Sequence, residues 1–364
     1  MRLVKLFLLL SALLLAFSRP LMAMDHSKPQ MLKDKYYKEY WKQHFLFDDG
    51  TFVSSQFLVA NLPWPVGKKH GIMIATLVRP DGTRTIIKNG RNFGGWGFDP
   101  EKFDLFIFDH RLSKDGEKDI IHIGTVGQDV IDITGRSTVP PLDNKRLTVK
   151  KGYMDSSFYL PYFEGEGSWK ILGDKKKPVE SGSGRVQGFA THVLFTAPVE
   201  KFVKSWLRVS GLRSKDHQPV PFLSSLEKPG GDRVIILTLK QPDGKIIRFP
   251  DVTIDYKDIK KGRKKSSFPT LYTLTARNGT DRLTGTIRFS RKIDHFNIND
   301  DLNFFERTFS SARASVTSYR YVADYDMDYV TAGGSQNLVG KAFGEYQDVL
   351  PPKKKKSKRK KRRR

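Results

Sequence analysis

The chain has 364 residues and a formal net charge of +25, with 38% hydrophobic and 12% aromatic residues. This length and apolar content are enough for a sizeable core, which excludes a chain that is disordered throughout. Cysteine is absent, which excludes disulfides, thiol catalysis and cysteine-ligated metal sites.

The first predicted element is an export signal over residues 1–23. Arg2 and Lys5 precede an apolar stretch over residues 6–17, and Ala23 offers a cleavage site. The stretch is shorter than the roughly 20 residues of a spanning helix, although an uncleaved N-terminal anchor is an alternative. We therefore expect an exported protein, periplasmic or secreted, that is soluble or bound peripherally to a membrane.

An N-terminal extension follows over residues 24–44, with a short helix expected over residues 31–42. From there on, strands alternate with turns. Hairpins are predicted over residues 44–53, 71–87 and 103–124, each around an Asp-Gly turn, and shorter strands over residues 130–135, 146–149 and 156–163. Turn signals at such regular spacing predict an all-β sandwich or barrel.

The sequence also contains a weak internal repeat. A Thr-Leu pair followed by Pro-Asp-Gly and Ile-Ile begins at residue 76 and again at residue 238, 162 residues later. Residues 183–192 match residues 337–346, 154 residues later. Two matches in the same order predict two tandem all-β halves. The predicted boundaries are 45–195 for the first barrel, 196–350 for the second and 351–364 for a disordered tail.

Three stretches carry a resemblance to a known superfamily. An aromatic strand beginning at Tyr40 runs into an Asp-Gly turn, a Gly-aromatic segment ends at His192, and a closing strand ends near Glu345. Over residues 40–350 these features resemble the tandem lipocalin-like superfamily, which includes carotenoid 1,2-hydratases, AttH-type proteins and yeast survival-factor proteins. The resemblance implies two tandem lipocalin-like antiparallel β-barrels. It also implies either ligand binding or catalysis, because the superfamily contains both.

Two positions depart from the pattern of the superfamily. Thr191 stands where the junction motif has an acid, and Ala342 replaces the second glycine of the closing strand. The first departure weakens the case for proton chemistry if that chemistry depends on the acid.

A ligand cavity is predicted from strand-facing aromatic residues. In residues 316–330 the tyrosines alternate with Asp324, Asp326 and Asp328, so the two kinds of side chain lie on opposite faces of a strand. The aromatic face either lines a hydrophobic cavity or simply packs in a core. Gln56 interrupts an otherwise apolar strand and is predicted to hydrogen-bond a ligand in the lumen. The predicted ligand-binding residues are Gln56, Phe57, Trp96, Phe106, Phe108, Tyr319, Tyr321 and Tyr325.

Standard catalytic motifs are missing from the sequence, so any catalysis must use isolated acids and bases. The candidate catalytic residues are Glu345, Asp326 and His192, and His110 is a further possible acid or base. A carboxyl group inside an apolar barrel has a raised pKa and could protonate an alkene, a reaction that needs no metal or cofactor. A buried, hydrogen-bonded structural carboxylate is the alternative for each acid. We expect no metal site and no cofactor.

The chain ends in a polybasic segment over residues 353–364, in which eleven of twelve residues are basic. Behind an export signal, this segment predicts contact with an anionic membrane surface or polymer, whereas no specific nucleic acid is expected. A purely solubilising tail is the alternative. The residues concerned are Lys353, Lys354, Lys355, Lys356, Lys358, Arg359, Lys360, Lys361, Arg362, Arg363 and Arg364.

Together these observations predict an exported binding protein for a hydrophobic ligand, a lipid or an isoprenoid, whose tail contacts anionic surfaces. One alternative is a cofactor-free hydratase, cyclase or isomerase acting on a terpenoid-like or carotenoid-like substrate. Another is a non-catalytic envelope scaffold that acts through the tail.

Overall fold

A computed structural model describes residues 26, 28–61, 69–91, 94–99, 101–124, 129–172, 179–212, 218–262, 266–297 and 314–352. The predicted export signal and the polybasic segment 353–364 lie outside these residues. Within the described ranges, the regular structure consists of antiparallel strands and one short 3-10 turn, η1 (Val199–Lys201). This part of the chain has no helix that is long and apolar enough to cross a membrane.

The first half of the chain forms one curled sheet in the order β4-β3-β2-β1-β13-β12-β9-β8-β7-β6-β5, with β10 and β11 paired to β12. Its strands are β1 (Lys38–Phe47), β2 (Phe52–Ala60), β3 (His70–Val78), β4 (Arg84–Arg91), β5 (Trp96–Phe98), β6 (Asp104–Ile107), β7 (His110–Asp115), β8 (Lys118–Gly124), β9 (Val130–Ser137), β10 (Leu142–Asp143), β11 (Leu147–Val149), β12 (Gly152–Ile171) and β13 (Glu180–Phe195).

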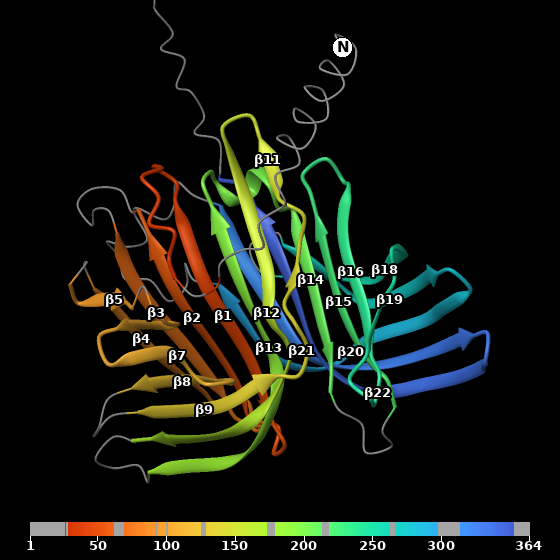
Figure 1. Cartoon of the computed structure of the whole chain (residues 1–364), viewed down its shortest axis with the longest axis horizontal. Coiled ribbons are helices and arrows are strands. Elements are labelled where there is room, and N and C mark those ends of the chain that lie inside the picture. The colour runs from red at the N-terminus through yellow and green to blue at the C-terminus, as the bar shows by residue number, and fades with distance from the viewer. Residues whose placement is uncertain are drawn as a thin grey trace, which may run out of the picture.

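The second half forms a separate sheet in the order β17-β16-β15-β14-β22-β21-β20-β19-β18. Its strands are β14 (Ser205–Gly211), β15 (Val220–Glu227), β16 (Arg233–Lys240), β17 (Ile246–Arg248), β18 (Asp251–Lys261), β19 (Ser267–Asn278), β20 (Asp281–Asn297), β21 (Ser315–Thr331) and β22 (Gly334–Leu350). Figure 1 shows the two halves side by side.

Both halves use the same strand order around their first strand. β4-β3-β2-β1-β13-β12 in the first corresponds to β17-β16-β15-β14-β22-β21 in the second. The predicted fold class, two tandem lipocalin-like antiparallel β-barrels, is confirmed. The repeat matches in the sequence fall on equivalent strands, because residues 76 and 238 lie in β3 and β16 and residues 189 and 343 lie in β13 and β22.

The predicted helix over residues 31–42 is wrong, because its second part belongs to β1. Both faces of β1 are buried: Trp41 and Phe45 face the core of the first barrel, while Lys42 and His44 lie on the opposite, also buried, face. A strand whose two faces are both buried lacks the alternation of apolar and polar residues by which strands are recognised.

The predicted hairpins over residues 44–53 and 71–87 correspond to β1–β2 and β3–β4. Gly50 in the first turn has a φ of +87°, a left-handed conformation that glycine adopts without strain. The predicted hairpin over residues 103–124 is a three-stranded meander instead. A turn at Phe108 and Asp109 divides its first strand into β6 and β7, and Phe108 itself has a φ of +58°.

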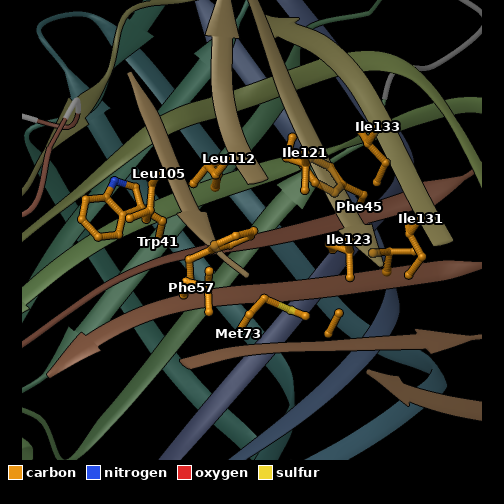
Figure 2. Packing of buried hydrophobic residues seen from close by; sticks show 14 of the residues in the cluster. Trp41, Phe45, Phe57, Met73, Leu105, Leu112, Ile121, Ile123, Ile131 and Ile133 are labelled. Carbon is orange, nitrogen blue, oxygen red and sulfur yellow. The ribbon is translucent and has the colours of Figure 1, made fainter. Parts of the chain in front are cut away.

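Three hydrophobic clusters fill the molecule. One lies inside the first barrel, where Trp41, Phe45, Phe57 and Met73 meet the leucine and isoleucine side chains of β6 to β9 (Figure 2). The second fills the second barrel and is rich in tyrosine. The third lies between the barrels and contains the two residues that the repeat relates, Phe189 and Phe343, with ring centroids 5.8 Å apart. The protein therefore has two separate barrel interiors and a packed interface between them.

Candidate functional site

The interior of the first barrel contains a group of buried polar side chains, here called the first-barrel centre. Its members come from β1, β2, β12, β13 and the segment that precedes β1. Glu39 and Gln43 lie on the face of β1 that also carries Trp41 and Phe45. Ser55 and His192 lie opposite Gln43 and Trp41 on the neighbouring strands, so the group lies among the apolar residues of the core. The first-barrel centre consists of His26, Tyr37, Glu39, Gln43, Ser55, Tyr159 and His192.

Glu39 and His192 form the core of the first-barrel centre. Both side chains are fully buried, and His192 Nε2 lies 2.8 Å from Glu39 Oε1. The other carboxylate oxygen of Glu39 accepts hydrogen bonds from the Tyr37 hydroxyl (2.5 Å) and the Gln30 backbone N–H (2.7 Å). Trp41 stacks on the His192 ring at 4.2 Å and fixes its plane. Both carboxylate oxygens of Glu39 therefore accept hydrogen bonds, and the one facing His192 is placed to exchange a proton with the imidazole.

A line of side chains connects this pair with the surface. His192 Nδ1 lies 3.1 Å from His26 Nδ1, and His26 Nε2 lies 3.8 Å from Asp143 Oδ1. Exposure rises along the line: the His192 side chain is 0% exposed, that of His26 18% and that of Asp143 39%. Each histidine can accept a proton on one ring nitrogen and release one from the other. Hydrogen-bond distances thus link Glu39 through His192 to the partly exposed His26, whereas Asp143 lies beyond hydrogen-bond distance of His26.

A second set of hydrogen bonds lies beside this line. Ser55 Oγ donates to Gln43 Oε1 (2.6 Å), and Gln43 Nε2 donates to the Tyr159 hydroxyl (2.9 Å). The lumen-facing polar residue of β2 is therefore Ser55. Gln56, the predicted lumen residue, lies on the opposite face of the strand, because neighbouring residues of a strand point to opposite sides and Phe57 is in the core.

Asp119 on β8 is a further acidic residue of the first barrel. It has the same strand parity as the core residues Ile121 and Ile123, and its side chain is buried. Burial raises the pKa of Asp119 to about 6, although the charge of Lys114 partly opposes this shift. Burial is also the main cause of the raised pKa of Tyr159, to which the charge of Asp119 adds. Asp119, which was not among the predicted acids, is thus a carboxyl group with a raised pKa in the interior of the first barrel.

We expect Asp119→Asn to stabilise the protein by about 2–3 kcal/mol at pH 8 and to have almost no effect at pH 4. The pKa of Asp119 is raised from 3.8 to about 6 in the folded chain, so the wild type loses stability as the pH rises through this window. An asparagine cannot ionise and avoids this loss. Urea unfolding at both pH values measures the difference. Asp115→Asn, at an exposed position of β7, is the control, and a gain that is equal at both pH values would contradict the assignment.

A different set of charges lies between the two barrels and is called the interface cluster: Lys42, His44, Arg208, Asp294, Arg320 and Glu345. All six side chains are buried. Glu345 is at the centre, with Lys42 Nζ 2.8 Å from Oε1 and Arg208 Nη2 2.5 Å from Oε2. His44 Nε2 lies 3.2 Å from Oε2, and Arg320 reaches both Glu345 (3.6 Å) and Asp294 (3.2 Å).

These neighbours determine the charge of Glu345. Burial alone would raise the pKa of Glu345, but the charges of Arg208 and Lys42 hold it well below its usual range. The predicted raised pKa is therefore wrong for Glu345, which has no proton to give at neutral pH. Burial lowers the pKa of Lys42 to about 7 and that of His44 to about 3, although Glu345 favours the charged form of both. The interface cluster holds the two barrels together by ion pairs and is poorly suited to donate protons.

The remaining predicted site residues lie in several places. Asp326 is exposed on the outer face of β21 and accepts a hydrogen bond from Asn337, which also donates to Asp328. Asp326 therefore lies outside the barrel interior in which an alkene could be protonated. His110 is buried near one edge of the first sheet, where its Nδ1 accepts the Gly124 N–H (2.9 Å). Of the predicted catalytic residues, His192 alone belongs to the first-barrel centre.

The predicted ligand-binding aromatics do not form one cavity. Phe57 and Trp96 belong to the core of the first barrel, whereas Tyr319, Tyr321 and Tyr325 belong to that of the second. The predicted strand with its tyrosines on one face is present as β21. Phe106 (37% exposed) and Phe108 (47% exposed) point outward, because Phe106 alternates with the core residues Leu105 and Ile107 and Phe108 lies in a turn.

Of the residues in the first-barrel centre, the sequence predicted His192 alone as a functional residue. Glu39, His26 and Asp119 were missed because no local motif contains them. One signal was available: Glu39 and Trp41 are two residues apart in β1, and β1 pairs with β13 so that Trp41 is opposite His192. Recognition of that pairing would have placed Glu39 beside His192.

No protein-family model matches the sequence, and no curated protein matches it. Solved structures do match the fold. An AttH-like protein from Nitrosomonas europaea has a TM-score of 0.55 at 11% identity, over 91% of this chain and 98% of that one. Kievitone hydratase from Nectria haematococca has a TM-score of 0.52 at 9% identity, over 90% and 91%. CghA, solved with Sch210972, has a TM-score of 0.58 at 13% identity, over 87% and 89%.

At these identities the likeness establishes the fold alone. All three neighbours are lipocalin-like barrel proteins, so the chain has the two-domain lipocalin-like fold that the sequence resemblance implies.

Proposed function

We propose that the chain is a cofactor-free acid–base catalyst, of the hydratase or isomerase class, which binds a hydrophobic small molecule in its first barrel. The observation that carries the proposal is the buried pair of Glu39 and His192, joined to the surface through His26. An acidic residue whose only role is structural needs no path along which protons can reach solvent.

The chemistry follows from the surroundings of two carboxyl groups in one barrel. Glu39 accepts a proton from the substrate, and His192 and the partly exposed His26 pass protons between Glu39 and solvent. Asp119, with a pKa raised by burial to about 6, holds a proton that it can donate in most molecules below pH 6 and in a minority of them at pH 7. A carboxylate hydrogen-bonded to a histidine can serve as a general base, and a carboxyl group with a raised pKa can serve as a general acid. Such a pair can add water to a double bond or move the bond.

The fold neighbours make this chemistry plausible for two lipocalin-like barrels. One of them is named as a hydratase, and another was solved together with a small organic molecule, Sch210972. This support is an analogy of fold, because function depends on the residues of the site.

Ligand binding without catalysis is the second candidate, and an observation in the second barrel favours it. Tyr319, Tyr321 and Tyr325 line one face of β21 inside that barrel. The buried hydroxyl of Tyr325 has no hydrogen-bond partner among the described residues. A buried hydroxyl without a partner costs free energy, and a polar atom of a bound lipid or isoprenoid would relieve that cost.

Organic extraction of the purified protein followed by mass spectrometry separates the two candidates. A stoichiometric small molecule that the protein converts on incubation, and that Glu39→Gln leaves unconverted, supports catalysis. A molecule that is bound but never converted, and is lost in Tyr325→Phe, supports binding alone. Absence of any bound molecule in protein from its native source would contradict both.

We also propose that residues 353–364 hold the protein near anionic surfaces of the cell envelope. Deletion of this segment, which carries eleven basic residues, should weaken binding to vesicles containing anionic phospholipid at least tenfold. Each basic residue near such a surface contributes at most about 1 kcal/mol, and salt screens the attraction. Vesicle sedimentation measures the binding, with neutral phosphatidylcholine vesicles as the control. Equal binding by the full and truncated chains would contradict the proposal.

A further inference from the structure

The interface cluster holds more positive than negative charge. Its cationic side chains are Lys42, Arg208 and Arg320, and its carboxylates are Asp294 and Glu345. All five are at most 7% exposed. Burial lowers the pKa of Lys42 to about 7, so Lys42 is charged in most molecules at pH 6. With Lys42 protonated, these five side chains carry one excess positive charge in a place that water does not screen. Buried charges of this kind are normally paired.

Several donors of the interface cluster also lack an acceptor. The Nε, Nη1 and Nη2 atoms of Arg208 and the Nε atom of Arg320 have no hydrogen-bond partner among the described residues. Two acceptors, Glu345 Oε2 and Asp294 Oδ1, also lack one, so four donors stand against two acceptors. Arg208 Nη2 lies 2.5 Å from Glu345 but outside hydrogen-bond geometry. The Trp206 ring lies over the flat face of the Arg208 guanidinium, 4.6 Å from its central carbon. This contact offers no acceptor to the N–H groups, which point outward in the guanidinium plane.

The internal repeat explains the imbalance. Thr191 and Glu345 occupy equivalent positions, 154 residues apart, and they pair with Lys42 on β1 and Arg208 on β14 respectively. Each half thus contributes one basic residue to the interface at this level. Only the second half contributes an acid, because Thr191 has a short, neutral side chain whose hydroxyl donates to the Lys42 carbonyl (3.4 Å). Lys42 shares Glu345 with Arg208 as a result.

We propose that the interface cluster binds one small monovalent anion, of the size of chloride, beside Arg208 and Lys42. One negative charge balances the excess and gives the Arg208 N–H groups an acceptor. The nearby carboxylates of Glu345 and Asp294 repel a multivalent ion such as sulfate. The aromatic rings of Phe52, Phe189 and Phe343, all within 6 Å of the His44 ring, leave no polar surroundings for a larger organic anion.

Thermal unfolding of the full chain in sodium chloride and in sodium gluconate of equal ionic strength tests the proposal. An anion that binds only the folded state raises the unfolding temperature in proportion to its saturation. We expect the midpoint in 0.1 M chloride to exceed that in gluconate by roughly 3–6 °C. Equal midpoints in the two salts would overturn the proposal.

Two substitutions at Thr191 distinguish specific binding from a general salt effect. Thr191→Glu supplies the carboxylate that the first half lacks, so the chloride dependence should disappear. Thr191→Val preserves shape without adding charge, so the dependence should remain. An equal chloride effect in both variants would also overturn the proposal. Since either variant could fail to fold, wild-type crystals grown in bromide give an independent result: an anomalous peak is expected beside Arg208 Nη1, and its absence there counts against the site.

Discussion

Glu345→Gln should lower the free energy of unfolding by about 3–5 kcal/mol, the largest loss of stability that we expect from a single substitution in this chain. Glu345 is fully buried and is contacted by Lys42, Arg208 and Arg320. Glutamine has almost the same shape but no charge, so the substitution leaves these cations at the interface with Asp294 as the nearest counter-charge. The cost comes from the unpaired cations, because the geometry of the side chain is preserved.

Chemical denaturation at pH 7 measures this loss, and Asp326→Asn on the exposed face of β21 is the matched control. The control should change stability by less than about 0.5 kcal/mol. The pKa of Glu345 is held well below its usual 4.5, so its stabilising effect is present above that pH and is lost only as the pH falls through the lower folded value. The difference between wild type and Glu345→Gln should therefore persist down to pH 4.5. A loss below 1 kcal/mol would contradict the role assigned to the interface cluster.

The parts of the fold that the sequence predicts are those with local signals. Asp-Gly turns located the β1–β2 and β3–β4 hairpins, since each turn and its two strands are contiguous. The alternation of tyrosines with aspartates predicted which face of β21 is buried. The signal exists because the opposite face is exposed to solvent in the C-terminal part of the strand, at Asp326 and Asp328. The internal repeat predicted two halves, and its matches lie on equivalent strands.

The polar centres could not be predicted in the same way, because they depend on pairings between distant strands. β1 pairs with β13 about 150 residues later, and this pairing alone places Trp41 opposite His192 and Glu39 next to both. The charge of Glu345 likewise depends on Arg208, on a different strand, and on Lys42, which is 303 residues away. Composition predicted that a carboxyl group in an apolar barrel has a raised pKa, but it could not distinguish Glu345, surrounded by cations, from Asp119, which is not.

His192→Gln should reduce turnover of the molecule that is extracted with the protein by 100-fold to 10,000-fold, the range typical of a lost general acid or base. Glutamine can keep one hydrogen bond, either to Glu39 or toward His26, but it cannot carry a proton between them. Glu39→Gln should cause a loss of similar size, and the double variant should be little worse than either single one, since both substitutions interrupt the same proton path.

The first barrel offers its own control for this experiment. His122 and Asp132 form another histidine–carboxylate pair, 2.6 Å apart, on β8 and β9. Both residues have the outward parity of their strands, because Ile121 and Ile131 face the core. His122→Gln should therefore leave turnover unchanged.

A structural role of His192 predicts a different result. If His192 only supports the packing of Trp41, its substitution should lower stability and raise the KM while kcat per folded molecule stays the same. A catalytic role predicts that kcat falls with little change in KM. It also predicts that His26→Gln, which interrupts the same path nearer the surface, lowers kcat less, since solvent protons can still reach His192 through the partly exposed position of His26. Unchanged kcat in His192→Gln would exclude the proposed proton path.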